Sequence, residues 1–359
     1  MLSGVYPFYR IATAAILLGT AIWLASSHPY DAEGMADSLQ ITQGGDRGAV
    51  VRSSRPLMGT TFNLSVWATA GKQPEASEAI QHALDLVASL EGKISSWNPE
   101  SETSAINRST PREAMGTSAE LLELLDVSLS WARRTDGAFD ITGGPLFDRW
   151  KRARAEGKLP TEAEIRSCLE RTGYDRVILE GRTVRLAKAN MQIGFGAIGK
   201  GFAADRAAAL LRQCGFEDFI IDAGGDVLVS GSRGGTPWQV AIRHPRRSGF
   251  LAVYGAGDRA IATSGDYEQF SVINDVRYAH ILDSRTGWPA RHLASVTVVT
   301  RRGVDADALA TALFVMGPEK GLAFVERLND TETLMVLEDG TTRCSKGLHL
   351  EEGRLEVVP

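Results

Sequence analysis

A glycine-rich loop in the middle of the chain limits its fold and its chemistry more than any other segment. Residues 194–201 read Gly-Phe-Gly-Ala-Ile-Gly-Lys-Gly, and the following residues 201–213 have the pattern of a helix that ends at Gly215. Small residues let a backbone approach a phosphate, and a helix N-terminus supplies N–H donors and positive potential. The loop therefore predicts a phosphate-bearing ligand, although a glycine-rich turn without any ligand is the simplest alternative for a single motif.

Two common nucleotide motifs match this loop, and each match has a defect. G-x-G-x-x-G is the dinucleotide fingerprint, but residues 188–192 make a poor buried parallel strand and no second β-α-β unit follows. G-x-x-x-x-G-K is most of a P-loop, but Gly201 stands where a serine or threonine hydroxyl should bind Mg²⁺. The loop alone does not decide which ligand is bound.

Composition excludes some classes of partner. The 359 residues are 43% hydrophobic, which is ample for a large core, and the formal net charge is −5. A nucleic-acid partner is not expected, because no basic excess exists to neutralise a phosphate backbone. The three cysteines are scattered without a C-x-x-C motif, so neither a zinc site nor a disulfide framework is predicted.

The N-terminal segment has the pattern of an export signal. Residues 11–25 form an uncharged apolar run behind Arg10, shorter than the about 20 residues that a membrane-spanning helix prefers. We expect residues 1–27 to be a signal peptide or an N-terminal membrane anchor, residues 28–54 a linker, and residues 55–359 the functional domain. The protein would then be periplasmic, or anchored to the cytoplasmic membrane and facing the periplasm.

Helical and strand patterns are mixed along the chain without sustained β-α-β alternation. Apolar stripes or runs predict helices at 74–91, 118–133, 161–171, 201–213 and 306–316. Alternating or buried apolar runs predict strands at 58–67, 176–179, 183–187, 219–222, 239–243, 277–282, 295–300, 333–337 and 355–358. Ser118 and Asp305 are expected to cap their helices, and residues 137–145 are expected to form a loop. The order predicts an α+β fold with mixed or antiparallel sheets packed with helices.

Further loop-like segments carry polar groups at the ends of predicted elements. They are residues 58–60, 95–99, 137–140, 222–226, 263–267, 280–287 and 307–313. In this order, and together with the glycine loop, they resemble the FAD:protein FMN transferase family, known as ApbE, from about residue 57 to about residue 345. The ordered set is specific even though each segment alone is weak. The resemblance implies an enzyme that splits FAD, joins FMN through its phosphate to a Thr or Ser hydroxyl of an acceptor protein, and releases AMP.

The resemblance also implies a Mg²⁺ site formed by Asp307, Thr311 and the main-chain oxygen of Ala197. Phosphoryl transfer needs charge neutralisation, and Mg²⁺ prefers oxygen ligands. In a helix, positions four apart project from one face, so Asp307 and Thr311 can act together. From the helix alone, the alternative is that Asp307 belongs to a cap and that Thr311 bonds back within the helix.

His280 falls at the position of the family's proposed base for the acceptor hydroxyl, and the pKa range of histidine suits that role. Taken alone, a histidine in a strand is more often structural. Lys200 is expected to neutralise phosphate or to pair with a carboxylate, and Asp222 and Asp226 are expected only to brace the pocket. The positions implied to hold FAD are Met58, Gly59, Thr60, Trp97, Ala138, Phe139, Asp140, Gly194, Lys200, Ser264, Gly265, Asp266 and Ile281.

Two residues depart from the family pattern. Gly194 stands where family members commonly have an acidic residue, so a carboxylate contact to FAD is absent or replaced, and Ser284 stands where many have proline. The implied acceptor is a membrane redox subunit with a Ser/Thr flavinylation site. Two alternatives remain open at this point: hydrolysis of FAD to FMN and AMP, and a flavin-binding assembly factor without turnover.

Overall fold

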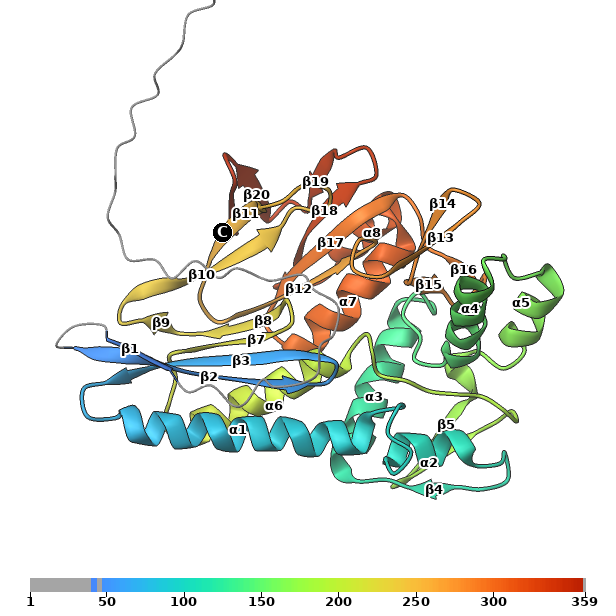
Figure 1. Cartoon of the computed structure of the whole chain (residues 1–359), viewed down its shortest axis with the longest axis horizontal. Coiled ribbons are helices and arrows are strands. Elements are labelled where there is room, and N and C mark those ends of the chain that lie inside the picture. The colour runs from blue at the N-terminus through green and yellow to red at the C-terminus, as the bar shows by residue number, and fades with distance from the viewer. Residues whose placement is uncertain (1–39, 44–46, 358–359) are drawn as a thin grey trace, which may run out of the picture. The chain divides into compact units, whose positions relative to one another are not determined.

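Antiparallel pairing builds the central sheet of the structure (Figure 1). The computed structural model describes residues 40–43 and 47–357. The strands of this nine-stranded sheet lie in the order β1 (Gln40–Gln43), β2 (Gly48–Leu57), β3 (Thr60–Thr69), β7 (Phe219–Ala223), β8 (Asp226–Ser230), β12 (Arg259–Gly265), β17 (Leu293–Thr300), β18 (Glu332–Leu337) and β19 (Thr342–Cys344). Neighbouring strands of this sheet pair antiparallel, from β1–β2 to β18–β19.

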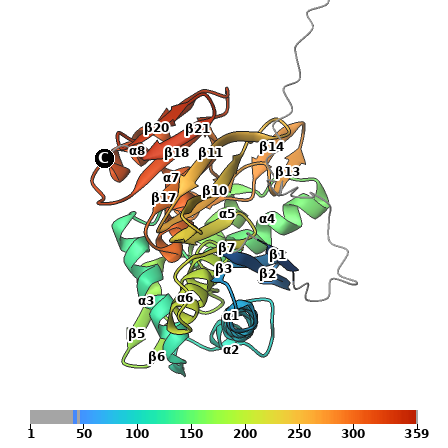
Figure 2. The ribbon, with the colours of Figure 1, turned by 90° about the vertical axis from the view of Figure 1, so that its left-hand side faces the viewer.

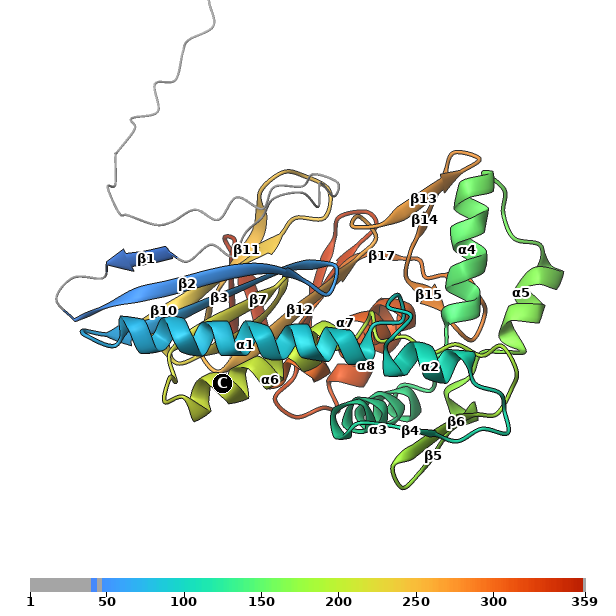
Figure 3. The ribbon, with the colours of Figure 1, turned by 60° about the horizontal axis from the view of Figure 1, so that its bottom comes forward.

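Helices cover one face of this sheet (Figure 3). The described helices are α1 (Gln73–Ile94), α2 (Glu102–Arg108), α3 (Ala119–Arg134), α4 (Gly144–Glu156), α5 (Glu162–Leu169), α6 (Gly199–Gln213), α7 (Gly303–Met316) and α8 (Pro318–Val325). Helix α6 packs between α1 and α7, and all three contact strands of the sheet. The main core lies between these helices and the sheet, and α7 is apolar almost all round because it is enclosed there.

A smaller sheet covers the opposite face of the central sheet (Figure 2). Its strands lie in the order β20 (Leu348–Glu351), β21 (Arg354–Val357), β11 (Phe250–Ala256), β10 (Thr236–Arg243) and β9 (Ser232–Arg233), and only β11 and β21 run parallel. Buried and exposed residues alternate along β10, so Trp238, Val240 and Ile242 face the second core. The architecture confirms the predicted α+β fold with mixed and antiparallel sheets.

The remaining strands form small sheets at one end of the fold. They are β4 (Met115–Gly116), β5 (Val177–Glu180), β6 (Thr183–Leu186), β13 (Phe270–Ile273), β14 (Val276–Ala279), β15 (Leu282–Asp283) and β16 (Trp288–Pro289). The β13–β14 hairpin packs on α4, where the ring centroids of Tyr278 and Trp150 lie 5.4 Å apart. In the described part of the chain no helix is long and apolar enough to cross a membrane. The apolar run 11–25 lies outside the described residues.

Several expected boundaries were wrong. Strand β2 begins at Gly48 and pairs with β3 along its length, so the expected linker 28–54 does not continue through residues 48–54. Helix α4 begins at Gly144, inside the expected loop 137–145, because Pro145 is well suited to a first helical turn. Ser118 does cap α3, as predicted, by accepting a hydrogen bond from the Leu121 amide.

The expected cap at Asp305 was also wrong, because α7 begins two residues before it. Asp305 lies in the first turn and accepts a hydrogen bond from Trp131 Nε1 at 2.8 Å. The cap comes from a different helix: Asp205 of α6 accepts hydrogen bonds from the amides of Gly303 at 2.7 Å and Val304 at 3.0 Å. A side chain thus joins α6 to the N-terminus of α7.

Helices α6 and α7 approach so closely that only glycine fits at their contact. A Cβ atom at Gly201 would lie 2.1 Å from the carbonyl oxygen of Gly303, and a Cβ at Gly303 would lie 2.6 Å from the carbonyl oxygen of Gly201. Because neither atom is at the end of a flexible side chain, the two helices would have to separate to admit a methyl group. This contact places the glycine loop directly beside α7.

We predict that Gly201→Ala destabilises the fold by about 3 kcal/mol or more, because the added methyl group meets backbone. Urea unfolding followed by circular dichroism measures the change. Gly92→Ala in α1 is the matched control, since no atom lies within 4 Å of its added Cβ. That control should change stability by at most about 1 kcal/mol, in the stabilising direction. Equal effects of the two substitutions would contradict the close-contact interpretation.

Candidate active site

The predicted residues Lys200 and Asp307 meet in one buried charge cluster. Lys200 lies in the first turn of α6, and its Nζ is 2.8 Å from Oδ2 of Asp226 and 3.5 Å from Oδ1 of Asp307. The other oxygen of Asp307, Oδ2, accepts a hydrogen bond from the Gly201 amide at 3.1 Å. Asp307 is only 5% exposed. The contact between α6 and α7 therefore brings the carboxylate of one helix to the N-terminus of the other.

Burial controls the ionisation of this cluster. Burial raises the pKa of Asp307 to about 7, with the Lys200 ammonium opposing the shift and Asp226 adding to it. Burial alone would lower the pKa of Lys200, but Asp226 and Asp307 outweigh it and raise that pKa well above its ordinary value. Glu268 lies within electrostatic reach of the same ammonium. Asp226 and Asp307 thus share one lysine, which leaves this cluster with an excess of negative charge when both carboxyl groups are ionised.

The second predicted magnesium ligand lies one helical turn further along α7. Thr311 Oγ1 is 3.3 Å from Ser264 Oγ at the end of β12. Ala197 lies in the glycine loop, directly before the N-cap residue of α6. No group of three or more His, Cys, Asp or Glu side chains in the described residues is arranged to hold a metal ion. The expected donors instead comprise one carboxylate, one hydroxyl and one carbonyl, and with the excess negative charge this oxygen set suits Mg²⁺.

His280 directly follows the β13–β14 hairpin. It is held by Gln269, the residue that directly precedes the hairpin. The main-chain amide of His280 donates to the Gln269 carbonyl at 3.1 Å, and Nδ1 lies 2.9 Å from the same oxygen. With Nδ1–H donating, Nε2 is the proton acceptor of the neutral ring. Burial lowers the pKa of His280, and the Lys200 charge lowers it further, while the Gln269 bond opposes the change. The imidazole is therefore neutral at neutral pH.

Two hairpin turns close the site near the start of α6. Met58 and Gly59 have φ of 54° and 73° in a two-residue turn between β2 and β3, which is the type I′ geometry. A Cβ added to Gly199 would lie 3.3 Å from the Met58 side chain, so Met58 packs on the first turn of α6. Thr60 packs against Gly224, in the turn that precedes Asp226.

Trp97 is the most exposed of the predicted flavin-binding side chains. It is 79% exposed, and Lys151 Nζ lies 4.9 Å from its ring centroid. Its neighbour Ser96 lies beside Gly194, where Oγ would be 3.6 Å from an added Cβ. The Gly194 amide donates to the Ile141 carbonyl at 2.8 Å, which joins the glycine loop to the segment 138–141.

Several predicted side chains are occupied by the fold itself. Ala138 and Phe139 are buried in the interior, so only their main chain is available to a ligand. Asp140 accepts hydrogen bonds from the Thr142 amide, the Thr142 hydroxyl and the Tyr174 amide, which hold its own loop. Ile281 is buried, and its carbonyl accepts from the Ala290 amide. Gly265 is buried as well, and both oxygens of Asp266 bind Arg246.

The sequence predicted too small a role for Asp226 in the site and gave no sign that Arg246 binds the predicted site residue Asp266. Asp226 was expected only to brace the pocket, yet it provides the shortest ion pair to Lys200. Its position directly after the Gly224-Gly225 turn is the sequence signal that could have indicated a role in the site. Asp222 does brace its turn, since Oδ1 accepts from the Gly225 amide at 2.8 Å. Arg246 lies in an irregular turn with no local pattern that would reveal its partner.

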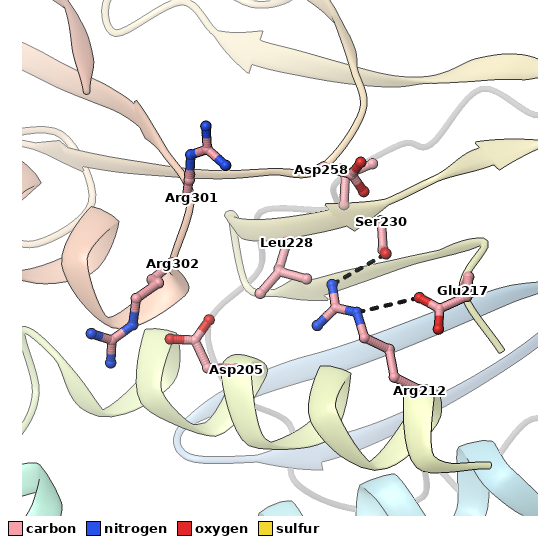
Figure 4. Close-up of a pocket in the computed structure, with 9 residues that line it drawn as sticks. Asp205, Arg212, Glu217, Leu228, Ser230, Asp258, Arg301 and Arg302 are labelled. Atoms are coloured by element: carbon pink, nitrogen blue, oxygen red, sulfur yellow. Dashed lines mark hydrogen bonds and ion pairs between the residues drawn. The ribbon is translucent and has the colours of Figure 1, made fainter. Parts of the chain in front are cut away.

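Two cavities lie near these elements. A cavity of about 510 Å³ lies on the Asp205 side of α6, where Arg212 bonds Ser230 and Glu217 (Figure 4). The residues found to line it include none of the predicted site residues. A cavity of about 420 Å³ lies between Asp140 and Ser284, and Ser284 Oγ donates to the Gly137 carbonyl at 3.1 Å. The second cavity therefore joins two of the predicted site segments.

The fold is that of solved flavin transferases. Flavin transferase ApbE from Vibrio cholerae superposes with a TM-score of 0.74 at 33% identity, covering 83% of this chain and 97% of that one. The ApbE protein from Thermotoga maritima gives a TM-score of 0.75 at 32% identity, with the same coverage. The FAD:protein FMN transferase of Escherichia coli K12 is 30% identical over 327 residues, or 88% of this chain and 90% of the relative. A family model described as the ApbE family matches residues 58–335, and the chain belongs to this family.

We predict that Lys200→Met destabilises the fold by about 2 to 4 kcal/mol near neutral pH, because Asp226 and Asp307 lose their shared counter-charge. Urea unfolding in the presence of EDTA measures the loss. Lys93→Met is the matched control, because Lys93 and Glu120 form a more exposed pair at 2.9 Å that should contribute less than about 1 kcal/mol. A loss no larger than that of the control would mean that the cluster does not depend on this lysine.

Proposed function

We propose that this protein is a Mg²⁺-dependent FAD:protein FMN transferase, which joins FMN to a Thr or Ser hydroxyl of an acceptor protein and releases AMP. The observation that carries the proposal is the cluster of Lys200, Asp226 and Asp307 at the glycine loop, with Thr311 one turn further along α7. Family membership and the names of the relatives support flavin transfer. The oxygen donors and the excess negative charge support the metal.

In the proposed reaction, the acceptor hydroxyl oxygen bonds to the phosphorus of the FMN half of FAD. The P–O bond from that phosphorus to the AMP half breaks, and AMP leaves with the bridging oxygen. The hydroxyl proton passes to Nε2 of His280, the acceptor nitrogen of a ring oriented by Gln269. The acceptor ends as a phosphoester, so no oxidant or reductant is needed.

The residues of the cluster have separate roles in this proposal. Asp307, Thr311 and the Ala197 carbonyl would hold Mg²⁺, which neutralises charge on the diphosphate when bound. Lys200 adds a fixed positive charge at the N-terminus of α6, where phosphate is already favoured. Trp97 offers an exposed aromatic face to a ring of FAD. Gly194 leaves the space beside Ser96 without a carboxylate.

The acceptor and the location belong to the same proposal. An exported enzyme, periplasmic or held at the cytoplasmic membrane, would meet a membrane redox subunit that carries a Ser/Thr flavinylation site. Hydrolysis of FAD is the main competing reaction, with water in place of the acceptor hydroxyl. A flavin-binding assembly factor would bind FAD and leave it intact.

The deciding experiment incubates the full chain with FAD, MgCl₂ and a purified membrane redox subunit that carries a candidate Ser/Thr flavinylation site, followed by mass spectrometry of the subunit. Transfer adds FMN less one water to the subunit, and tandem spectra locate it on one Ser or Thr. Free FMN and AMP without an adduct would instead identify a hydrolase. Unchanged FAD would identify a binding protein.

We predict that Asp307→Ala lowers turnover by at least about 100-fold, because the carboxylate ligand of the metal is lost. Initial rates across a MgCl₂ titration measure the change. Asp305→Ala is the control from the same helix, because Asp305 bonds Trp131 and lies outside the proposed metal site. It should retain the magnesium dependence of the unmodified chain. Full activity of Asp307→Ala would remove the metal assignment.

We predict that His280→Ala lowers kcat by about 100-fold while FAD affinity stays largely unchanged. Because burial lowers the pKa of His280, the midpoint of the acid limb in the pH profile of kcat/KM should lie below pH 6.5, the ordinary histidine value. Activity is then full at pH values above this midpoint and is lost as falling pH protonates the ring. Rates from pH 5 to 9, with FAD affinity from flavin fluorescence, test both statements. Loss of FAD binding without a change in kcat would make His280 a structural residue.

A further inference from the structure

The smaller sheet reaches the candidate site through one ion pair. Arg246 lies in the turn between β10 and β11, and it binds Asp266 through two parallel contacts, Nη1 to Oδ1 at 2.5 Å and Nη2 to Oδ2 at 2.7 Å. Asp266 is 7% exposed. A bidentate guanidinium–carboxylate pair fixes orientation as well as distance, which a lysine cannot reproduce. The pair therefore restrains the backbone that follows β12.

That backbone carries groups of the candidate site on both sides of Asp266. Ser264, two residues earlier, has its Oγ 3.3 Å from Oγ1 of Thr311. Tyr267 follows Asp266, and its ring lies against Gly265, where an added Cβ would be 2.3 Å from the ring. The Asp266 amide donates to the Ala294 carbonyl at 3.1 Å.

A second arginine from the same sheet holds the neighbouring residue. The guanidinium of Arg243, the last residue of β10, lies 5.5 Å from the ring centroid of Tyr267. The smaller sheet thus contacts the segment after β12 at two successive residues. Both contacts come from an element that supplies none of the predicted site residues.

We infer that Arg246 is a positioning residue of the active site, which acts through Asp266 to fix Ser264 against Thr311. This inference rests on the proposed function, because the geometry it protects is that of FAD and metal binding. It also gives Asp266 a different role from the one implied by the family resemblance. Because the two parallel contacts to Arg246 fix the orientation of the Asp266 carboxylate, this inference assigns it to holding the loop in place of contacting FAD.

The test compares Arg246→Ala, Arg246→Lys and the control Arg247→Ala in the full chain. Arg247 is the next residue and contacts His244, away from Asp266, so its removal leaves the pair intact. Arg246→Ala should raise the KM for FAD and the MgCl₂ requirement by about 10-fold, with a smaller change in kcat. Arg246→Lys should recover only part of this loss. Arg247→Ala should match the unmodified chain.

Two further measurements separate positioning from general destabilisation. Hydrogen exchange should rise at residues 264–268 in Arg246→Ala and stay unchanged in the paired strand 295–300. In an Asp266→Asn background, Arg246→Ala should cause little additional loss of FAD affinity, because the two residues act as one unit. Normal exchange and an unchanged KM in Arg246→Ala would overturn the inference. So would a large loss of FAD binding in Asp266→Asn together with an unaffected Arg246→Ala, since Asp266 would then contact FAD directly.

The proposed function and this inference can fail separately. Absence of FMN transfer by the unmodified chain would refute the transferase proposal. The exchange rates at residues 264–268 would still decide whether Arg246 fixes this segment.

Discussion

The contact between two glycines, Gly201 of α6 and Gly303 of α7, is the constraint on which the site depends. Because neither helix has a Cβ atom at this contact, the Asp307 carboxylate can accept a hydrogen bond from the Gly201 amide while it also faces Lys200. A wider separation would leave a buried carboxylate without a donor and a lysine without one of its partners, which is costly in a protein interior. Gly201, the last residue of the glycine loop, thus serves the packing of α6 on α7.

The fold class followed from the sequence because its signals are local. Apolar periodicity identified α1 and α3, and the Ser118 cap could be assigned from residue type and position. The order of strands in the central sheet could not be predicted in this way, since β8, β12 and β17 pair across long connections. Residues 48–54 of β2 have the sequence pattern of a linker because the polar residues 52–55 obscure their pairing with β3.

The site could be predicted only as a set of segments. The ordered motifs indicated the family, which the comparisons confirmed, and Lys200 and Asp307 do meet in the structure. Contacts between distant segments were not accessible from the sequence. Asp226 pairs with Lys200, Asp205 caps a helix that begins almost a hundred positions away, and Arg246 binds Asp266. In each case the polar partner is selected by sheet register and helix packing, which no short motif records.

The Asp205 bridge has a mechanical consequence. Helices α6 and α7 are joined by this side chain, by the glycine contact and by the Asp307–Gly201 hydrogen bond, so neither can slide along the other without breaking all three. The end of the candidate site formed by the glycine loop and α7 is therefore preorganised. Adaptation to ligands of different shape is then expected at Trp97, which is exposed, and at the β13–β14 hairpin, whose strands pair only with each other in the described part of the chain.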